Sequence, residues 1–269
     1  VDAIIHVLRC FDDDNVIHVD GNVNPVSDKE IIDLELQLKD LETLEKRIGA
    51  IERKAKSGDK ESEKIYKVYT QAREHLVSGN SIRSLDVDEA LFKFLDELQL
   101  ITAKPVIYVC NVDESSVISG NQHVENVKEL VSNENAEILV LGAGIESDIA
   151  ELDDFEERKM FLEDLGLEEA GVSKLIKNAY SLLNLQTYFT AGEKEVRAWT
   201  IKKGMTAPQA AGVIHTDFEK GFIKAEVIKF SDFVQYGSEN SVKEAGKLMI
   251  QGKEYVVNDG DVMHFRFNV

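Results

Sequence analysis

The fold class of this chain is decided by the stretch Val106-Ile107-Tyr108-Val109-Cys110-Asn111-Val112-Asp113-Glu114. Its first five residues are a continuous apolar run, which is typical of a strand buried in a parallel sheet. Ligands of open α/β sheets bind just beyond the carboxyl ends of such strands, so we expect Asn111 at a binding site. An asparagine in this place is also typical of a plain turn or cap, and the stretch alone leaves that alternative open.

The polar end of the stretch has the chemistry of a nucleotide-base reader. In GTPases the corresponding motif is Asn-Lys-x-Asp, whose acidic residue accepts hydrogen bonds from guanine. Here Val112 stands at the lysine position and Glu114 at the acidic one, so the guanine reader is altered. An asparagine amide can instead pair with adenine, accepting from N6 and donating to N7. We predict that Asn111 reads adenine, that Val112 packs on the base plane and offers its backbone, that Glu114 lies nearby, and that Asp113 is solvated.

Strand and helix patterns alternate on both sides of Asn111. Apolar runs at 1–11 and 136–141 predict two further strands, and helices are expected at 124–131, 149–165 and 172–183, the last capped near Ser173. Such alternation predicts an α/β fold with a doubly wound sheet.

A helical insertion interrupts this sheet. Ser27 or Asp28 is expected to cap a long helix. Its apolar stripe consists of Ile31, Leu34, Leu38, Leu41, Leu44 and Ile48. A turn at 57–59 precedes a second helix over 59–77, which predicts an antiparallel hairpin, and a third helix over 86–98 returns the chain to the sheet.

Basic side chains gather near the tip of this hairpin. Five of them are candidates for contact with RNA or a ribosomal surface: Arg53, Lys54, Lys56, Lys60 and Lys64. The alternative is a solvated coiled-coil end with mixed charge pairs, which is the commoner meaning of such a pattern.

From Leu185 onward the pattern changes to short strands and turns, which predicts a small β-grasp-like α+β unit. Strands are expected at 187–190, 196–200, 225–228, 255–257 and 262–267, and Thr206 is expected to cap a helix over 208–215. The predicted domains are a nucleotide-binding part at 1–27 and 101–183, the insertion at 28–100, and the last unit at 184–269.

Composition places the chain among ordinary globular proteins, with 43% apolar and 30% charged residues and a net charge of −19. Residues 184–269 contain 11 basic and 11 acidic residues, so residues 1–183 hold the whole acidic excess. This excess argues against non-specific nucleic-acid binding by the nucleotide domain. No run is apolar enough for a membrane span. Cys10 and Cys110 are expected to be neighbouring reduced core thiols, which fits a cytoplasmic protein.

Four landmarks in chain order resemble the YchF or Obg-like ATPase family, and the resemblance extends over essentially the whole chain. They are the opening strand Val1–Phe11, the run Asp20–Asp28 before the insertion, the loop Gly142–Glu146 with the residues 148–152 behind it, and the final segment Leu185–Val269, which is similar to a TGS domain. The resemblance implies a partial P-loop NTPase-type sheet with a helical insertion and a terminal TGS domain.

The resemblance also implies further site residues and partners. Backbone donors of Ala143, Gly144 and Ile145 would lie beside the base, and Val23 and Asn24 would approach it from the loop before the insertion. The implied activity is hydrolysis of ATP in preference to GTP, with Mg²⁺ as cofactor and the ribosome, through its large subunit, or RNA as partner. A GTP-specific enzyme of the same fold and a non-catalytic ribosome- or RNA-binding module are the alternatives.

The motifs that would hold phosphate and magnesium are missing from the sequence. It contains no Gly-x-x-x-x-Gly-Lys-Ser/Thr loop, and no Asp-x-x-Gly follows a strand. We therefore predict no catalytic residue and no metal ligand, and expect these residues alone to be inactive. Because residue 1 already stands at the start of a core strand, the chain is expected to be roughly the carboxyl-terminal three quarters of a longer protein.

Overall fold

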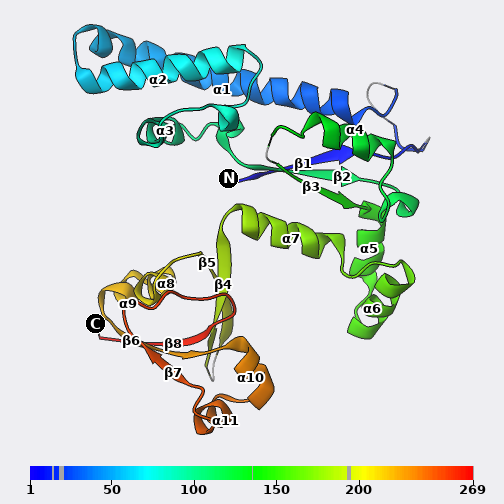
Figure 1. The fold of residues 1–269 in the computed structure, drawn as a ribbon, viewed down its shortest axis with the longest axis vertical. Helices are drawn as coiled ribbons and strands as arrows, with labels where there is room; N and C mark the ends of the chain where they lie inside the picture. The colour runs from blue at the N-terminus through cyan, green and yellow to red at the C-terminus, as the bar shows by residue number, and fades with distance from the viewer. Residues whose placement is uncertain (14, 18–20, 135, 193–194, 269) are drawn as a thin grey trace. The chain divides into compact units, whose positions relative to one another are not determined.

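The computed structural model describes residues 1–269 except 14, 18–20, 135, 193–194 and 269. It consists of two compact units, Val1–Ala179 (unit 1) and Tyr180–Val269 (unit 2) (Figure 1). The domain boundaries expected from the sequence stay a prediction.

A parallel sheet forms the centre of unit 1. Within the described residues its order is β1 (Ile4–Arg9), β2 (Val106–Asn111) and β3 (Glu137–Leu141). Arg9 lies opposite Asn111, and Asn111 lies opposite Leu141, so the three carboxyl ends are level. The central strand β2 is buried along its apolar run, as predicted, because it has a neighbour on each side.

The core of this sheet lies under α4 (Gln122–Leu130). Leu8 of β1, Cys10 just after it and Cys110 of β2 pack there with Val124 and Val127 of α4. The two cysteines are free thiols and fully buried, and they lie side by side as expected. The other face of β1 is open, with about half of Ile5 and Val7 exposed.

The insertion is a long helical hairpin, made of α1 (Pro25–Lys56) and α2 (Lys60–Val77) (Figure 1). It is followed by a 3₁₀ turn at Ile82–Ser84, α3 (Glu89–Asp96) and a second 3₁₀ turn at Ile101–Ala103. The hairpin has its own core, in which Leu44 and Ile48 of α1 meet Val68, Ala72 and Leu76 of α2. The expected antiparallel pair is therefore confirmed.

The first half of α1 buries a different face from the one that the sequence predicts. Ile31, Leu34 and Leu38 are each more than half exposed, whereas the polar residues Lys29, Gln37 and Asp40 are buried.

The reason is that this half of the helix meets backbone groups where the chain returns to the sheet. Asp40 accepts hydrogen bonds from the N–H groups of Ile101 (2.8 Å) and Thr102 (2.6 Å), and Gln37 donates to the carbonyl of Gly79 (3.1 Å). Buried N–H and C=O groups need such partners, so polar side chains occupy the inner face.

Three helices follow the sheet: α5 (Ala143–Glu151), α6 (Phe155–Asp164) and α7 (Gly171–Leu182), the last of which continues past the end of unit 1. The single acidic helix predicted over 149–165 is wrong, because the Asp154 carboxylate caps a new helix by accepting from the N–H groups of Glu156 and Glu157. The predicted cap near Ser173 is also wrong. The Glu146 carboxylate accepts from the N–H groups of Gly171 (2.6 Å) and Val172 (3.1 Å) and so caps α7 from a distance.

Unit 2 is an α+β unit with a mixed sheet, as expected. Its strands are β4 (Leu185–Ala191), β5 (Val196–Lys202), β6 (Phe222–Ile228), β7 (Met249–Gln251) and β8 (Val262–Phe267), in the order β5-β4-β8-β6-β7. Its helices are α8 (Ala207–Ile214), α9 (Thr216–Lys220), α10 (Phe230–Tyr236) and α11 (Glu239–Glu244). Thr206 and Gln209 form the capping box of α8. The strand expected at 255–257 is reduced to one bridge between Thr206 and Val256.

Candidate nucleotide-base site

Asn111 ends β2 at the carboxyl edge of the parallel sheet, where the sequence predicts a ligand. Its side-chain oxygen Oδ1 accepts a hydrogen bond of 2.9 Å from the N–H of Ala143, the first residue of α5. This bond orients the amide, because it directs the oxygen toward α5. An amide oxygen can accept a second hydrogen bond, and its nitrogen carries two donors. Asn111 therefore keeps the acceptor and the donor that an adenine edge requires.

Val112 does not have the predicted role. Its side chain is only 4% exposed and packs in the core beneath α4. Its N–H donates to the carbonyl of Leu141 (2.9 Å), so that donor is also engaged. The reason is the alternation of the strand, which places Val112 on the same face as Cys110 and opposite to Asn111. Packing of Val112 on a base plane is thus wrong for this structure.

Asp113 and Glu114 begin a 3₁₀ turn over Glu114–Ser116. Asp113 is a cap and not a merely solvated carboxylate, since it accepts from the Ser115 hydroxyl and from the hydroxyl and N–H of Ser116. The hydroxyl of Ser115, followed by the Ser116 groups, lowers the pKa of Asp113. The Glu114 side chain is exposed beside it.

The loop that leads into α5 brings three predicted residues next to Asn111. Ala143 and Gly144 are exposed, and a Cβ atom added at Gly144 would have no neighbouring atom within 4 Å. Ile145 is buried under them. The first N–H groups of a helix have no partner inside the helix. With the Ala143 donor held by Asn111, the N–H groups of Gly144 and Ile145 are the backbone donors at this edge.

Val23 and Asn24 lie on a neighbouring loop, and the described contacts do not join them to Asn111. Asn24 caps α1 by accepting from the Ser27 N–H (3.3 Å), with Pro25 in the first turn. The predicted cap at Ser27 or Asp28 is therefore wrong, and the Asn24 side chain is engaged. Val23 lines a cavity of about 300 Å³ at the end of β1.

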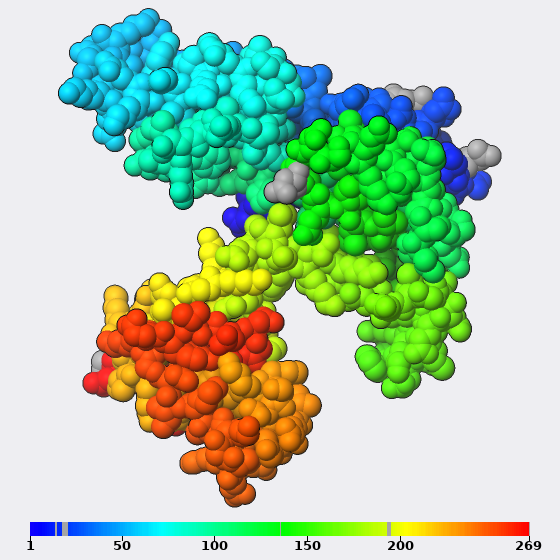
Figure 2. Space-filling view, viewed as in Figure 1, coloured from blue at the N-terminus to red at the C-terminus, as the bar shows by residue number. Residues whose placement is uncertain are grey.

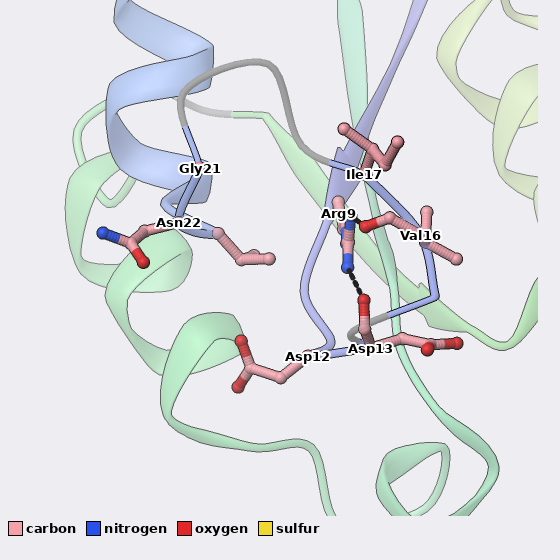
Figure 3. A pocket seen from close by; sticks show the side chains of 8 residues that line it. Arg9, Asp12, Asp13, Val16, Ile17, Gly21 and Asn22 are labelled. Carbon is pink, nitrogen blue, oxygen red and sulfur yellow. Dashed lines mark hydrogen bonds between the residues drawn. The ribbon is translucent and has the colours of Figure 1, made fainter.

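Arg9 is a residue of this edge that the sequence reasoning missed. It lies opposite Asn111 in the sheet and donates hydrogen bonds to three backbone carbonyls of the following loop, those of Phe11, Asp13 and Val16. Its guanidinium also lies over the Phe11 ring, and it borders the cavity in Figure 3. An arginine at the polar end of an apolar strand is the signal that could have drawn attention to it.

The basic tip of the hairpin is a second candidate surface. All five predicted residues are exposed: Arg53, Lys54, Lys56, Lys60 and Lys64. Lys56 is paired with Glu52 at 2.6 Å, while the other four form no ion pair within 4.0 Å in the described part of the chain. A groove of about 540 Å³ runs between α1 and α2 beside Lys54, with Ile51, Ile65 and Tyr69 along it. The tip thus carries unpaired positive charge.

The described residues contain no group of three or more His, Cys, Asp or Glu side chains that could hold a metal ion. They therefore do not fit the Mg²⁺ that the family resemblance implies. Nor does any helix in the described part of the chain combine the length and the apolar character that a bilayer crossing needs.

Known proteins are similar to this sequence along its whole length or nearly so. It is 52% identical over 271 residues to the ribosome-binding ATPase YchF of Bacillus subtilis (strain 168), covering 100% of this chain and 74% of that protein. It is 44% identical over 273 residues to Obg-like ATPase 1 of Xenopus laevis, covering 99% of this chain and 68% of that protein. Residues 185–268 match the family model YchF-GTPase_C, which is described as a protein of unknown function.

Solved structures show the same architecture. The structure of the Schizosaccharomyces pombe YchF GTPase matches with a TM-score of 0.82 at 36% identity, covering 99% of this chain and 72% of that one. A GTP-binding protein from Pyrococcus horikoshii OT3 matches with a TM-score of 0.58 at 15% identity, which is a likeness of fold alone.

Proposed function

The chain belongs to the YchF and Obg-like ATPase family, and from this premise we propose that it recognises the base of ATP, in preference to GTP, for a nucleotide hydrolase that works at the ribosome. The observation that carries the proposal is the bond from the Ala143 N–H to Asn111 Oδ1. It orients one amide at the sheet edge and leaves the two donors of its nitrogen and a second acceptor site of its oxygen for a ligand.

Adenine fits this edge through its N6 and N7 atoms. Asn111 Oδ1 would accept from N6–H, and Nδ2 would donate to N7, the bidentate pattern by which amides read adenine. The exposed backbone of Ala143 and Gly144 allows the base to approach closely. The phosphate-binding part of the reaction has no residues in this sequence, so we assign base recognition to the chain and expect no hydrolysis from these residues alone.

The test compares two variants of Asn111, one that removes the whole amide and one that replaces only its NH2 group by an oxygen. Asn111→Ala removes both adenine bonds and is expected to weaken ATP binding by about 1 to 3 kcal/mol, or roughly 5- to 150-fold. Asn111→Asp keeps an acceptor for the Ala143 N–H but has no donor for N7, so it should also lose ATP. Asn126→Ala, an exposed asparagine on α4, is the control. Unchanged ATP affinity in Asn111→Asp would overturn the assignment.

Specificity for GTP is the second candidate, and the exposed carboxylate of Glu114 favours it. A carboxylate there could accept hydrogen bonds from the guanine N1 and N2 edge, and one related structure is that of a protein named a GTPase. Competition between ATP and GTP, in the wild-type protein and in Glu114→Gln, separates the two. A preference for GTP that disappears in Glu114→Gln would support this second candidate.

The basic tip is our proposed contact with RNA, in the large ribosomal subunit, and this partner would place the protein in the cytoplasm. Relatives are named ribosome-binding, and four cations of the tip have no ion pair among the described residues, in a chain whose net charge is −19. Phosphate contacts of this kind are strongly weakened by salt.

Co-sedimentation with ribosomes tests this contact. Joint reversal of Lys54, Lys56 and Lys60 to Glu should abolish salt-sensitive binding, while the same reversal at Lys39, Lys93 and Lys128, which are exposed elsewhere in unit 1, should not. Equal loss in both triple variants would mean that only net charge matters. Ribosome binding that persists when nucleotide binding is lost would favour the non-catalytic module.

A further inference from the structure

Helix α6 stands apart from the core of unit 1. None of its residues, Phe155–Asp164, is buried. Figure 1 shows it beyond the end of α5, and in Figure 2 this segment stands out from the body of the unit. It is nevertheless a built element. Asp154 caps two of its N–H groups, and Arg158 donates to the carbonyl of Leu152 (2.5 Å). Its shape is therefore fixed by local bonds and not by burial.

Large apolar side chains are exposed on this projecting helix. Phe155 is 73% exposed and Met160 is 58% exposed. Ile118, which is 69% exposed, lies beside the turn that follows α6, since a side chain at Gly166 would begin 3.2 Å from its Cδ1 atom. Phe155 and Met160 are five positions apart, or about 140° around the helix axis, so they do not share one face. We call the face of α6 that bears Phe155 the α6 surface. Aromatic side chains are enriched in the cores of protein interfaces, so an exposed phenylalanine on an ordered helix is a candidate anchor.

The charge around the α6 surface defines what can cover it. Residues 146–169 contain eleven acidic and two basic residues, a net charge of −9 within a chain of −19. Only one ion pair lies within α6 among the described residues, a long one of 3.9 Å between Lys159 and Glu163. A nucleic acid or an anionic membrane would be repelled. A cationic protein segment would be attracted and could offer apolar side chains to Phe155.

We infer that the α6 surface docks a protein segment rich in Lys or Arg that presents an apolar patch to Phe155. This contact is separate from base recognition and from the basic tip, whose charge is opposite. The acidic residues steer the partner, and Phe155 supplies the apolar contact that makes the encounter specific.

The test uses the whole chain and synthetic peptides as probes. The first peptide is an amphipathic helix of Leu and Lys, the second replaces every Leu with Ser, and the third replaces every Lys with Glu. Only the first should bind by fluorescence anisotropy at about 0.1 M salt. Phe155→Ser should weaken it about tenfold or more, the scale of a lost aromatic anchor. Phe230→Ser, which changes a 53% exposed ring in unit 2, should have no effect.

A double variant and a check of folding keep the result unambiguous. Glu156→Lys with Glu157→Lys should also abolish binding, and circular dichroism should show that each variant keeps its helices, as expected for positions without buried contacts. Equal binding of the Leu-free peptide, or no effect of Phe155→Ser, would mean attraction by charge alone and would overturn the proposal. Absence of any binding by the Leu and Lys peptide would overturn it as well.

Discussion

Replacement of Lys29 by Met should destabilise unit 1 while leaving unit 2 unchanged. Lys29 joins the insertion to the nucleotide-binding part, since its Nζ atom lies 2.6 Å from a carboxylate oxygen of Asp33 and 2.6 Å from one of Glu134. Its side chain is 5% exposed. Glu134 also accepts from the Tyr108 hydroxyl (2.7 Å) and lies 3.5 Å from Arg83.

The pKa shifts in this cluster agree with strong pairing. Burial alone would lower the pKa of Lys29, but its bonds to Asp33 and Glu134 outweigh burial and raise it. Burial would likewise raise the pKa of Glu134, yet the bonds from Lys29 and Tyr108 lower it. Both groups are therefore charged at neutral pH.

The expected loss follows from what the substitution leaves behind. Removing one partner of a buried ion pair costs about 3 to 5 kcal/mol, because the other charge remains without compensation. Arg83 still neutralises part of Glu134, which places the expectation at the lower end, about 3 kcal/mol. The exposed Lys39→Met, which removes a pair with Glu42 on the same helix, should cost less than about 1 kcal/mol.

The chain contains its own internal control for this measurement. Its single tryptophan, Trp199, lies in unit 2, so its fluorescence follows the unfolding of that unit alone. Far-UV circular dichroism follows the long helices α1 and α2 of unit 1. In a urea titration, Lys29→Met should move the dichroism transition and not the fluorescence transition. Equal dichroism transitions in Lys29→Met and wild type would refute the claim that the buried pairs of Lys29 stabilise the contact between the insertion and the nucleotide-binding part.

Two further predictions concern packing and pH. Gly171→Ala should destabilise unit 1 by about 1 to 3 kcal/mol in the same titration, because its Cβ would lie 2.8 Å from both Leu141 and the Glu146 carboxylate. The control Gly49→Ala, in open space within α1, should stabilise unit 1 by about 0.5 to 1 kcal/mol. Similar effects of the two substitutions would contradict the close approach at Gly171. Acidification should destabilise unit 1 in two steps. The first falls below a pH of about 6.5, since burial lowers the pKa of His6 and the unfolded chain takes up that proton more readily, and the second falls below about 4.5, where Glu134 is protonated. His6→Asn should remove the first step only, and an unchanged first step in that variant would refute its assignment to His6.

Local patterns predicted much of this fold. The apolar run before Asn111 is β2, and the spacing of Leu44 and Ile48 matches the buried face of the hairpin. The same spacing failed at Lys29 and Asp40, whose hydrogen-bond partners lie 105 and 61 residues away. No local periodicity contains such contacts, and burial of those polar groups depends on them.

The candidate site was predictable in position but not in orientation. The end of a buried strand located Asn111. Strand alternation, extended past Cys110, also predicts that Val112 points into the core. The capping of α7 by Glu146 could not be foreseen, since the two groups are 25 residues apart and meet only in the folded unit.

The central claim is that the Asn111 amide meets the base of ATP. Its most direct test is NMR of the isotopically labelled protein, following the Asn111 side-chain amide and the backbone N–H groups of Ala143 and Gly144 as nucleotide is added. We predict that ATP shifts all three signals and that GTP at the same concentration shifts them much less. Larger shifts with GTP, or ATP binding that leaves the Asn111 amide signal in place, would contradict the claim.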